Sequence, residues 1–186
     1  MLGVFLDTEA NGLNFLIHHP IEIAFKIVDL YTKRVVSSYE AVLGMEKEEW
    51  DLSDPESLKV CEMTWQQVCN GISREAAGKE IVRHFQNAGV KRKEAVFICQ
   101  NPSFDRAYFA QLVPQEQQEA LSWPYHWLDL ASMYWAISMK NGRLLAENEI
   151  TKNKIAAAYG LPPEAKPHRA MNGVDHLILC YEAVVG

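Results

Sequence analysis

The sequence lacks the features that mark several classes of protein. No apolar run approaches the roughly 18 residues of a membrane span, and the amino terminus has no basic start or cleavage site. The four cysteines contain no Cys-x-x-Cys pair, which argues against a zinc site and fits reduced thiols; they are Cys61, Cys69, Cys99 and Cys180. These absences predict a soluble, cytoplasmic protein with no membrane partner.

Basic residues are also scarce, because 18 Lys and Arg stand against 24 Asp and Glu and give a net charge of −6. That sign excludes nucleic-acid binding by a general basic surface. It does not exclude a nucleic-acid substrate, since metal ions held by carboxylates can reverse the charge locally. The 186 residues contain no repeat, low-complexity tract or linker, so we expect one domain over residues 1–186.

Two kinds of hydrophobic pattern divide the chain. Leu2 to Leu6 is a short apolar run, while Ile21 to Asp29 and Arg34 to Leu43 carry strand patterns, so these three are expected to form an antiparallel meander. Two further strands are expected at Ala95 to Cys99 and at Trp127 to Leu130. The sequence therefore predicts an α/β fold with a mixed five-stranded sheet flanked by helices.

The expected helices alternate with the later strands. They cover residues 64–69, 73–88, a segment capped by Ser103, 131–140, 151–159 and 171–185, whereas 45–62 is expected to be irregular.

Four acids lie at positions where a carboxylate needs a partner that the neighbouring residues in the sequence do not supply. Asp7 and Glu9 follow a buried strand at positions i and i+2, so both carboxylates point to one side if the strand continues. Asp105 and Asp175 each share an apolar helical stripe, where a carboxylate needs a partner. Hard oxygen ligands of this kind suit Mg²⁺ or Mn²⁺.

These acids occur in order with one histidine. Asp7-Thr-Glu9, Asn101-Pro-Ser-Phe-Asp105 and His168-Arg-Ala-Met with the following Asp175 form a series that resembles the DEDDh 3′–5′ exonucleases. That family includes the proofreading subunit of bacterial replicative polymerase and oligoribonuclease, and its fold is RNase H-like. The resemblance spans nearly the whole chain.

The resemblance implies a catalytic role for each of these residues. Asp7, Glu9, Asp105 and Asp175 would hold two divalent metal ions, Mg²⁺ or Mn²⁺, and His168 would act as general base. The reaction would release nucleoside 5′-monophosphates from the 3′ end of single-stranded DNA or RNA. The residues implied to contact the terminal nucleotide are Gly12, Leu13, Asn101 and Phe104.

The chain departs from the family pattern in three places. The family usually separates its histidine from its last acid by four residues, whereas six lie between His168 and Asp175 and the family position holds Gly173. We expect a longer turn at Asn172-Gly173 that delays the last helix. Ala10 and Asn11 replace hydroxyl residues, and few basic residues can follow a phosphate backbone; the candidates are Lys140, Arg143, Lys152, Lys154, Lys166 and Arg169.

Three functional interpretations stay open. The chain is a 3′–5′ exonuclease, or it is a catalytically inactive module of the same fold that binds nucleic acid or protein. The enzyme could also serve as a subunit docked on a polymerase or repair partner. DNA or RNA preference and oligomeric state cannot be read from the sequence.

Overall fold

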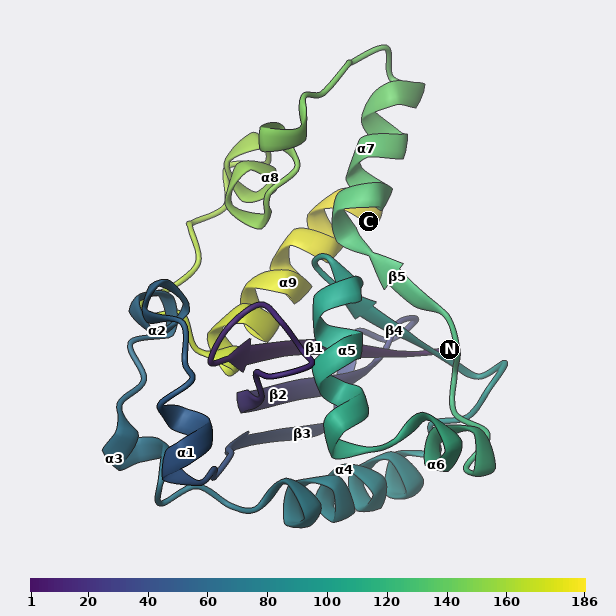
Figure 1. Ribbon diagram of the computed structural model, residues 1–186. Coiled ribbons are helices and arrows are strands. Elements are labelled where there is room, and N and C mark those ends of the chain that lie inside the picture. Colours follow the sequence, from purple (N-terminus) through teal and green to yellow (C-terminus); the bar gives the residue numbers. More distant parts are fainter.

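One mixed sheet organises the chain in the computed structural model, which describes residues 1–186 (Figure 1). Its strand order is β3-β2-β1-β4-β5, with antiparallel pairing among β1 to β3 and parallel pairing of β1 with β4 and of β4 with β5. The strands are β1 (Leu2–Ala10), β2 (Pro20–Asp29), β3 (Arg34–Val42), β4 (Ala95–Cys99) and β5 (Trp127–Asp129). The predicted fold class is confirmed.

The central strand β1 is longer than its apolar run suggests. It continues through Asp7 and Glu9 to Ala10, with Asp7 opposite Ala24 and Glu9 opposite Glu22 on β2. Because side chains alternate along a strand, Asp7 and Glu9 point to the same side of the sheet as Phe5, which belongs to the core beneath α9 (Ala170–Val185).

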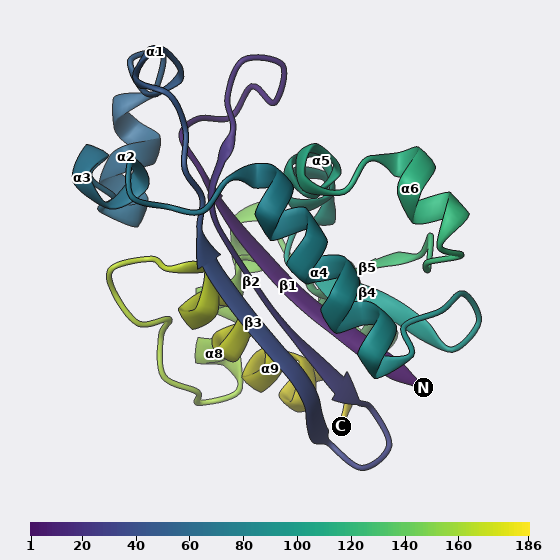
Figure 2. The same cartoon turned by 90° about the horizontal axis from the view of Figure 1, so that it is seen from below.

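Helices cover both faces of this sheet. On one face, α4 (Arg74–Ala88) and α5 (Pro102–Leu112) enclose a core that includes Phe85, Phe97 and Trp123. On the other face, α9 packs on β1 and β2, as the view from below shows (Figure 2). The remaining helices are α1 (Lys47–Trp50), α2 (Pro55–Cys61), α3 (Trp65–Val68), α6 (Gln115–Ala120), α7 (Leu130–Lys140), the 3₁₀ turn η1 (Glu147–Glu149) and α8 (Lys152–Ala158).

Three local predictions are wrong. Residues 45–62 contain the short helices α1 and α2, because Asp54 accepts hydrogen bonds from the amides of Glu56 and Ser57 and Pro55 starts the second helix. Ser103 does not cap α5, which begins at Pro102 after Asn101. The turn expected at Asn172-Gly173 is absent, because both residues lie inside α9.

Two further findings concern the state of the cysteines and the search for membrane-spanning helices. The four cysteines are free, and only Cys69 is exposed. None of the helices has the length and hydropathy needed to cross a bilayer.

Candidate active site

Three of the predicted acids lie on two joined segments, the end of β1 and the start of α5. Asp105 lies in the first turn of α5 and is buried. Its Oδ1 accepts hydrogen bonds from the Thr8 amide and the Thr8 hydroxyl, both at 2.9 Å. Since Thr8 stands between Asp7 and Glu9 on β1, these bonds fix the start of α5 against the end of the strand that carries the other two acids.

The pKa values of these three carboxyl groups are raised, in each case mainly by burial. Burial raises the pKa of Asp7 to about 6, although the neighbouring Lys152 opposes the shift. Burial, followed by repulsion from Asp7, raises the pKa of Glu9 to about 8 and that of Asp105 well above its usual range.

Another acid, Glu22 on the neighbouring strand β2, already has a cationic partner in Arg169. Its carboxylate accepts hydrogen bonds from Arg169 Nε at 2.9 and 3.0 Å and from the Ala170 amide at 2.9 Å. This fork of bonds ties the start of α9 to the sheet. Because its charge is paired with Glu22, Arg169 is not available to bind a phosphate backbone. Its role here is to anchor the start of α9.

The predicted general base, His168, lies close to these acids in the loop that precedes α9. It is near enough for its charge to affect the pKa of Asp7. Its Nδ1 lies 3.2 Å from Oε1 of the buried Glu164. An ionised carboxylate can only accept a hydrogen bond, which assigns the proton of a neutral His168 to Nδ1 and leaves Nε2 as the acceptor.

Glu164 is held by a buried cation as well. Lys152 Nζ at the start of α8 lies 2.9 Å from Glu164 and 3.6 Å from Asp7 Oδ1. Burial opposes the charge of Lys152, but Asp7 and Glu164 outweigh it and raise the pKa of the ammonium above its usual value. The same ion pair lowers the pKa of Glu164 despite its burial.

The last predicted ligand, Asp175, is not brought to the acid cluster. Its side chain is 52% exposed and forms an ion pair with Lys26 of β2. The residue that faces Asp7 is Gly173, where an added Cβ would lie 2.0 Å from Asp7 Oδ2. Two residues along a helix turn the side chain by roughly 200°, so Asp175 cannot point where Gly173 does. The extra turn that would have corrected this does not form.

The four residues assigned to the terminal nucleotide lie on two segments next to the acids. The carbonyl of Gly12 accepts a hydrogen bond from Tyr108 Oη at 2.7 Å, and the His18 ring occupies the space of a Cβ at Gly12. Leu13 is 75% exposed. Asn101 adopts a left-handed conformation with φ of 57°, and the Phe104 ring lies 4.8 Å from that of Tyr108.

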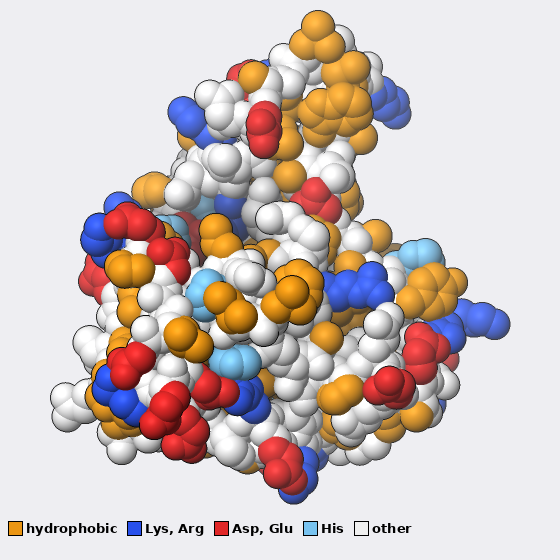
Figure 3. Space-filling model, viewed as in Figure 1, with side chains coloured by type: hydrophobic (Ala, Val, Ile, Leu, Met, Phe, Trp, Pro, Cys, Tyr) orange, Lys and Arg blue, Asp and Glu red, His pale blue; other side chains and the backbone are white.

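The space-filling view shows the surroundings of these segments. This face is hollowed between the projecting α7–α8 part and the α1–α3 part, with charged and histidine side chains inside the hollow (Figure 3). Apolar side chains gather beside it; exposed ones near Leu13 along the chain are Phe15, Leu16 and Ile17.

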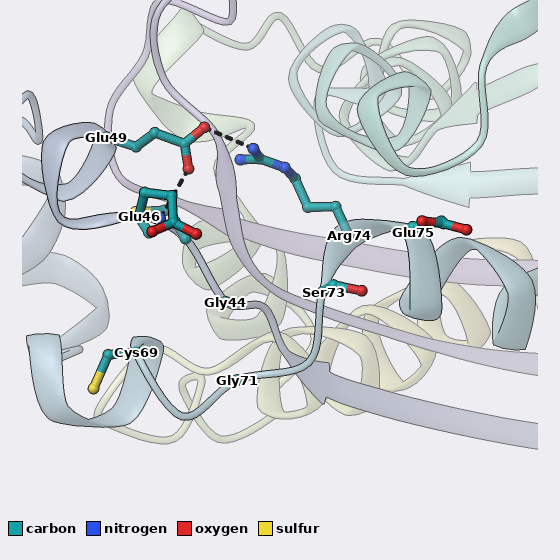
Figure 4. A pocket seen from close by; sticks show the side chains of 9 residues that line it. Gly44, Glu46, Glu49, Cys69, Gly71, Ser73, Arg74 and Glu75 are labelled. Carbon is teal, nitrogen blue, oxygen red and sulfur yellow. Dashed lines mark hydrogen bonds and ion pairs between the residues drawn. The ribbon is translucent and has the colours of Figure 1, made fainter.

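A separate cavity of about 400 Å³ lies between α1, α3 and the start of α4, and none of the predicted acids lines it. Its walls include Glu46, Glu49 and Arg74, and the Arg74 guanidinium pairs with Glu49 at 2.6 Å (Figure 4). The cavity is acidic and its one arginine is paired. It therefore offers no charge for a phosphate group.

Asp7, Glu9 and Asp105 carry hard carboxylate oxygens of the kind that Mg²⁺ or Mn²⁺ prefers. As they are placed, no three His, Cys, Asp or Glu side chains form a group that could hold a metal ion. The side chain that would complete a fourth ligand is absent at Gly173.

Sequence reasoning missed the role of two residues at this site. Lys152 was expected to follow a phosphate backbone, whereas it is paired with carboxylates. Glu164 was not singled out, since it follows Pro162 and Pro163 in a loop and belongs to no periodic pattern. Only the fold brings it to within 3.2 Å of His168.

Comparison with known proteins gives a match in structure alone. No family model and no curated protein matches the sequence. The nuclease domain of 3′hExo, a DEDDh family member, bound to rAMP, matches with a TM-score of 0.74 at 12% identity, over 96% of this chain and 88% of that chain. E. coli exonuclease I in complex with a dT13 oligonucleotide matches with a TM-score of 0.77 at 16% identity, over 98% of this chain and 40% of that chain.

A full-length 3′-exonuclease also matches, with a TM-score of 0.74 at 13% identity over 96% of this chain. The present chain spans 58% of that protein. The chain therefore has the RNase H-like fold of DEDDh 3′-exonuclease domains. At these identities the likeness concerns the fold.

Proposed function

We propose that this chain is a metal-dependent 3′–5′ exonuclease that hydrolyses the terminal phosphodiester bond of single-stranded DNA or RNA and releases nucleoside 5′-monophosphates. One observation carries the proposal: Asp7, Glu9 and Asp105, on the end of β1 and the start of α5, have raised pKa values in the fold of a 3′-exonuclease domain. Buried acids are costly to keep unpaired, which favours a site that receives a cation.

A divalent cation at these acids would activate a water molecule and neutralise charge on the scissile phosphate. The chain supplies the proton acceptor. His168 takes the proton of the attacking water at Nε2, while Glu164 holds Nδ1 at 3.2 Å and fixes the orientation of the ring. Glu164 is thus a positioning residue, and Lys152 keeps it ionised.

The Gly12–Leu13 turn and the Asn101–Phe104 turn supply a place for the terminal nucleotide. The exposed Leu13 side chain and the Phe104 ring offer apolar surface on which a base can pack. Tyr108 joins the two turns, because its hydroxyl bonds to Gly12 and its ring packs against Phe104. Apolar packing of this kind is tolerant of sequence, so we propose cleavage without base preference.

The same site supports a second candidate function. Gly173 in place of an acid, together with Lys152 beside Asp7, is what a chain would show if it had kept the fold and lost catalysis. In that case the chain binds a nucleic-acid end or a protein without cutting.

The test is incubation of the purified chain with 5′-labelled single-stranded DNA and RNA in Mn²⁺ or Mg²⁺, with products resolved at nucleotide level. We expect a ladder that shortens from the 3′ end, and no cutting of a circular single strand. Retention of the labelled strand without cleavage would support the inactive module. Internal cuts in the circle would contradict an exonuclease.

A further inference from the structure

His176 of α9 is a buried polar side chain that the proposed reaction does not use. The residue is 4% exposed, and its Nε2 lies 2.9 Å from the carbonyl oxygen of Pro162. A carbonyl oxygen can only accept a hydrogen bond, so Nε2 of His176 carries a proton and donates it. The other ring nitrogen, Nδ1, makes no hydrogen bond and lies 3.8 Å from Oε2 of Glu164. The bond to Pro162 is therefore the short contact that directs this ring.

Pro162 belongs to the segment that carries Glu164 and His168. Residues 161–169 join α8 to α9 without helix or strand. The Leu161 amide is bonded to α8, and the Glu164 amide donates to Asn153 Oδ1 at 2.9 Å. Between these two points stand two prolines, which have no amide hydrogen, so only carbonyl groups can tie the backbone there. His176 supplies that tie from α9.

The position of Glu164 decides whether His168 is held. Its buried carboxylate lies 2.9 Å from Lys152 Nζ and 3.2 Å from His168 Nδ1. The second distance is at the long end of the range for a hydrogen bond, so a shift of the segment by about 1 Å would break it. The ring of His168 would then be free to turn and to carry its proton on either nitrogen.

We infer that His176 is a positioning residue for His168: by bonding to the Pro162 carbonyl it keeps Glu164 within reach of His168 Nδ1, which leaves Nε2 as the proton acceptor. The effect on catalysis rests on the proposed function, whereas the place of the proton on His168 does not. His176 makes no hydrogen bond to His168 or to the acids of β1 and α5, so it acts through the segment that contains Glu164.

Nuclear magnetic resonance of the whole chain, labelled with ¹⁵N at histidine, tests the inference without substrate or metal. The shifts of the ring nitrogens report which one carries the proton, and the His168 signals are those that His168→Ala removes. At a pH above the range in which these signals move, we expect the wild-type proton on Nδ1. In His176→Leu, which has no donor for the Pro162 carbonyl, a large share of the molecules should carry it on Nε2.

Two further variants separate the lost donor from a general loss of packing. His176→Gln should keep the wild-type placement of the proton, because its amide nitrogen can donate where Nε2 does. His84→Leu is the matched control: His84 is a half-buried histidine with a 2.7 Å bond to Ser37, on α4 at the other face of the sheet. In the mononucleotide-release assay, His176→Leu should lower kcat roughly tenfold with little change in KM, and the other two should retain most activity.

A wild-type proton on Nε2 would overturn the inference whatever the variants do. So would unchanged His168 signals in a His176→Leu chain that melts like the wild type, or equal changes in the Leu and Gln variants. Should His176→Leu fail to fold, His176→Asn takes its place, because its shorter side chain puts the amide near the position of Nδ1. A wild-type chain that carries the proton on Nδ1 but cleaves no strand would overturn the nuclease proposal and leave this inference intact.

Discussion

The two sides of the candidate site are built in different ways. On the first side, β1 and the start of α5 hold Asp7, Glu9 and Asp105, joined by short bonds through Thr8. On the second side, residues 152–175 hold Lys152, Glu164 and His168 by ion pairs between α8 and the loop that precedes α9. On the first side Lys152 lies 3.6 Å from Asp7 and Asp105 accepts only from Thr8, whereas on the second side Glu164 pairs with both Lys152 and His168.

The difference indicates that the two sides of the site have different tasks. The acid side carries carboxyl groups with raised pKa values, of which Asp105 is buried and Asp7 and Glu9 are half-buried, and such groups are typical of functional sites. On the Lys152–Glu164 side, Glu164 can position His168 as the base, and Lys152 offsets part of the negative charge of Asp7. Substitutions on the two sides should therefore fail in different ways.

Asp7→Asn should have the largest effect on activity. Asp7 is the acid that contacts both sides, so its loss removes a metal ligand and the partner of Lys152. We expect turnover to fall by roughly 10³-fold or more in a mononucleotide-release assay. Far-ultraviolet circular dichroism should be unchanged. A loss below tenfold would place the metal elsewhere.

His168→Ala should reduce turnover by roughly 10²- to 10⁴-fold, the range typical of a general base. Because His168 is not a ligand in this account, Mn²⁺ affinity should change little, and calorimetry measures this separately. Glu164→Gln should lower turnover less, since the ring loses its orientation but keeps its acceptor. If His168→Ala weakened Mn²⁺ binding as much as Asp7→Asn, the division between the two sides would not hold.

Gly173→Ala should lower activity and leave thermal stability almost unchanged. Alanine favours a helix by up to about 1 kcal/mol over glycine, but its Cβ would lie 2.0 Å from Asp7 Oδ2. The carboxylate must move, and we expect turnover to fall roughly tenfold or more with little loss of thermal stability. Asn172→Ala on the same helix is the control. Equal activity of the two variants would show that Asp7 is not fixed by α9.

Metal-free stability should depend on pH through Glu9. The pKa of this carboxyl is 4.5 in the unfolded chain and about 8 in the folded chain, so between these values the folded state binds more protons. Stability in EDTA should therefore fall as pH rises from 5 to 8. Melting curves should show a decrease of several degrees, at about 2–4 °C per kcal/mol. Glu9→Gln should weaken this dependence and leave the part that Asp7, with its pKa raised to about 6, contributes. A wild-type curve that rises over the range would contradict the prediction.

Asp175→Asn should have the smallest effect. The residue is exposed and its ion pair with Lys26 lies at the surface, so we expect turnover to change less than about twofold and stability by less than about 1 kcal/mol. The mononucleotide-release assay decides this directly. A loss comparable to that of Asp7→Asn would mean that Asp175 reaches the metal after a movement of α9.

The placement of the acids on β1 and α5 could be predicted from the sequence, because the patterns involved join residues that are close along the chain. Period-two alternation predicted β2, and the i and i+2 spacing of Asp7 and Glu9 required only that β1 continue. Asp105 in the stripe of Tyr108 and Phe109 predicted a buried carboxylate, and the structure confirms its burial.

The second side could not be predicted in the same way. Whether Gly173 or Asp175 faces Asp7 depends on the residue at which α9 begins, and a shift of two positions moves a side chain to the opposite side of the helix. The pairing of Lys152 with Glu164 joins two residues across the end of α8 and a proline-containing loop, which carry no shared periodicity. Only tertiary structure brings them together.

The most direct test of the account is the metal dependence of mononucleotide release by the wild-type chain. The protein is freed of metal with EDTA, assayed on a 5′-labelled single strand, and assayed again after Mn²⁺ or Mg²⁺ is added. The account predicts no release without metal and recovery of release after addition. Full activity in excess EDTA would contradict the assignment of Asp7, Glu9 and Asp105 as a metal-binding site.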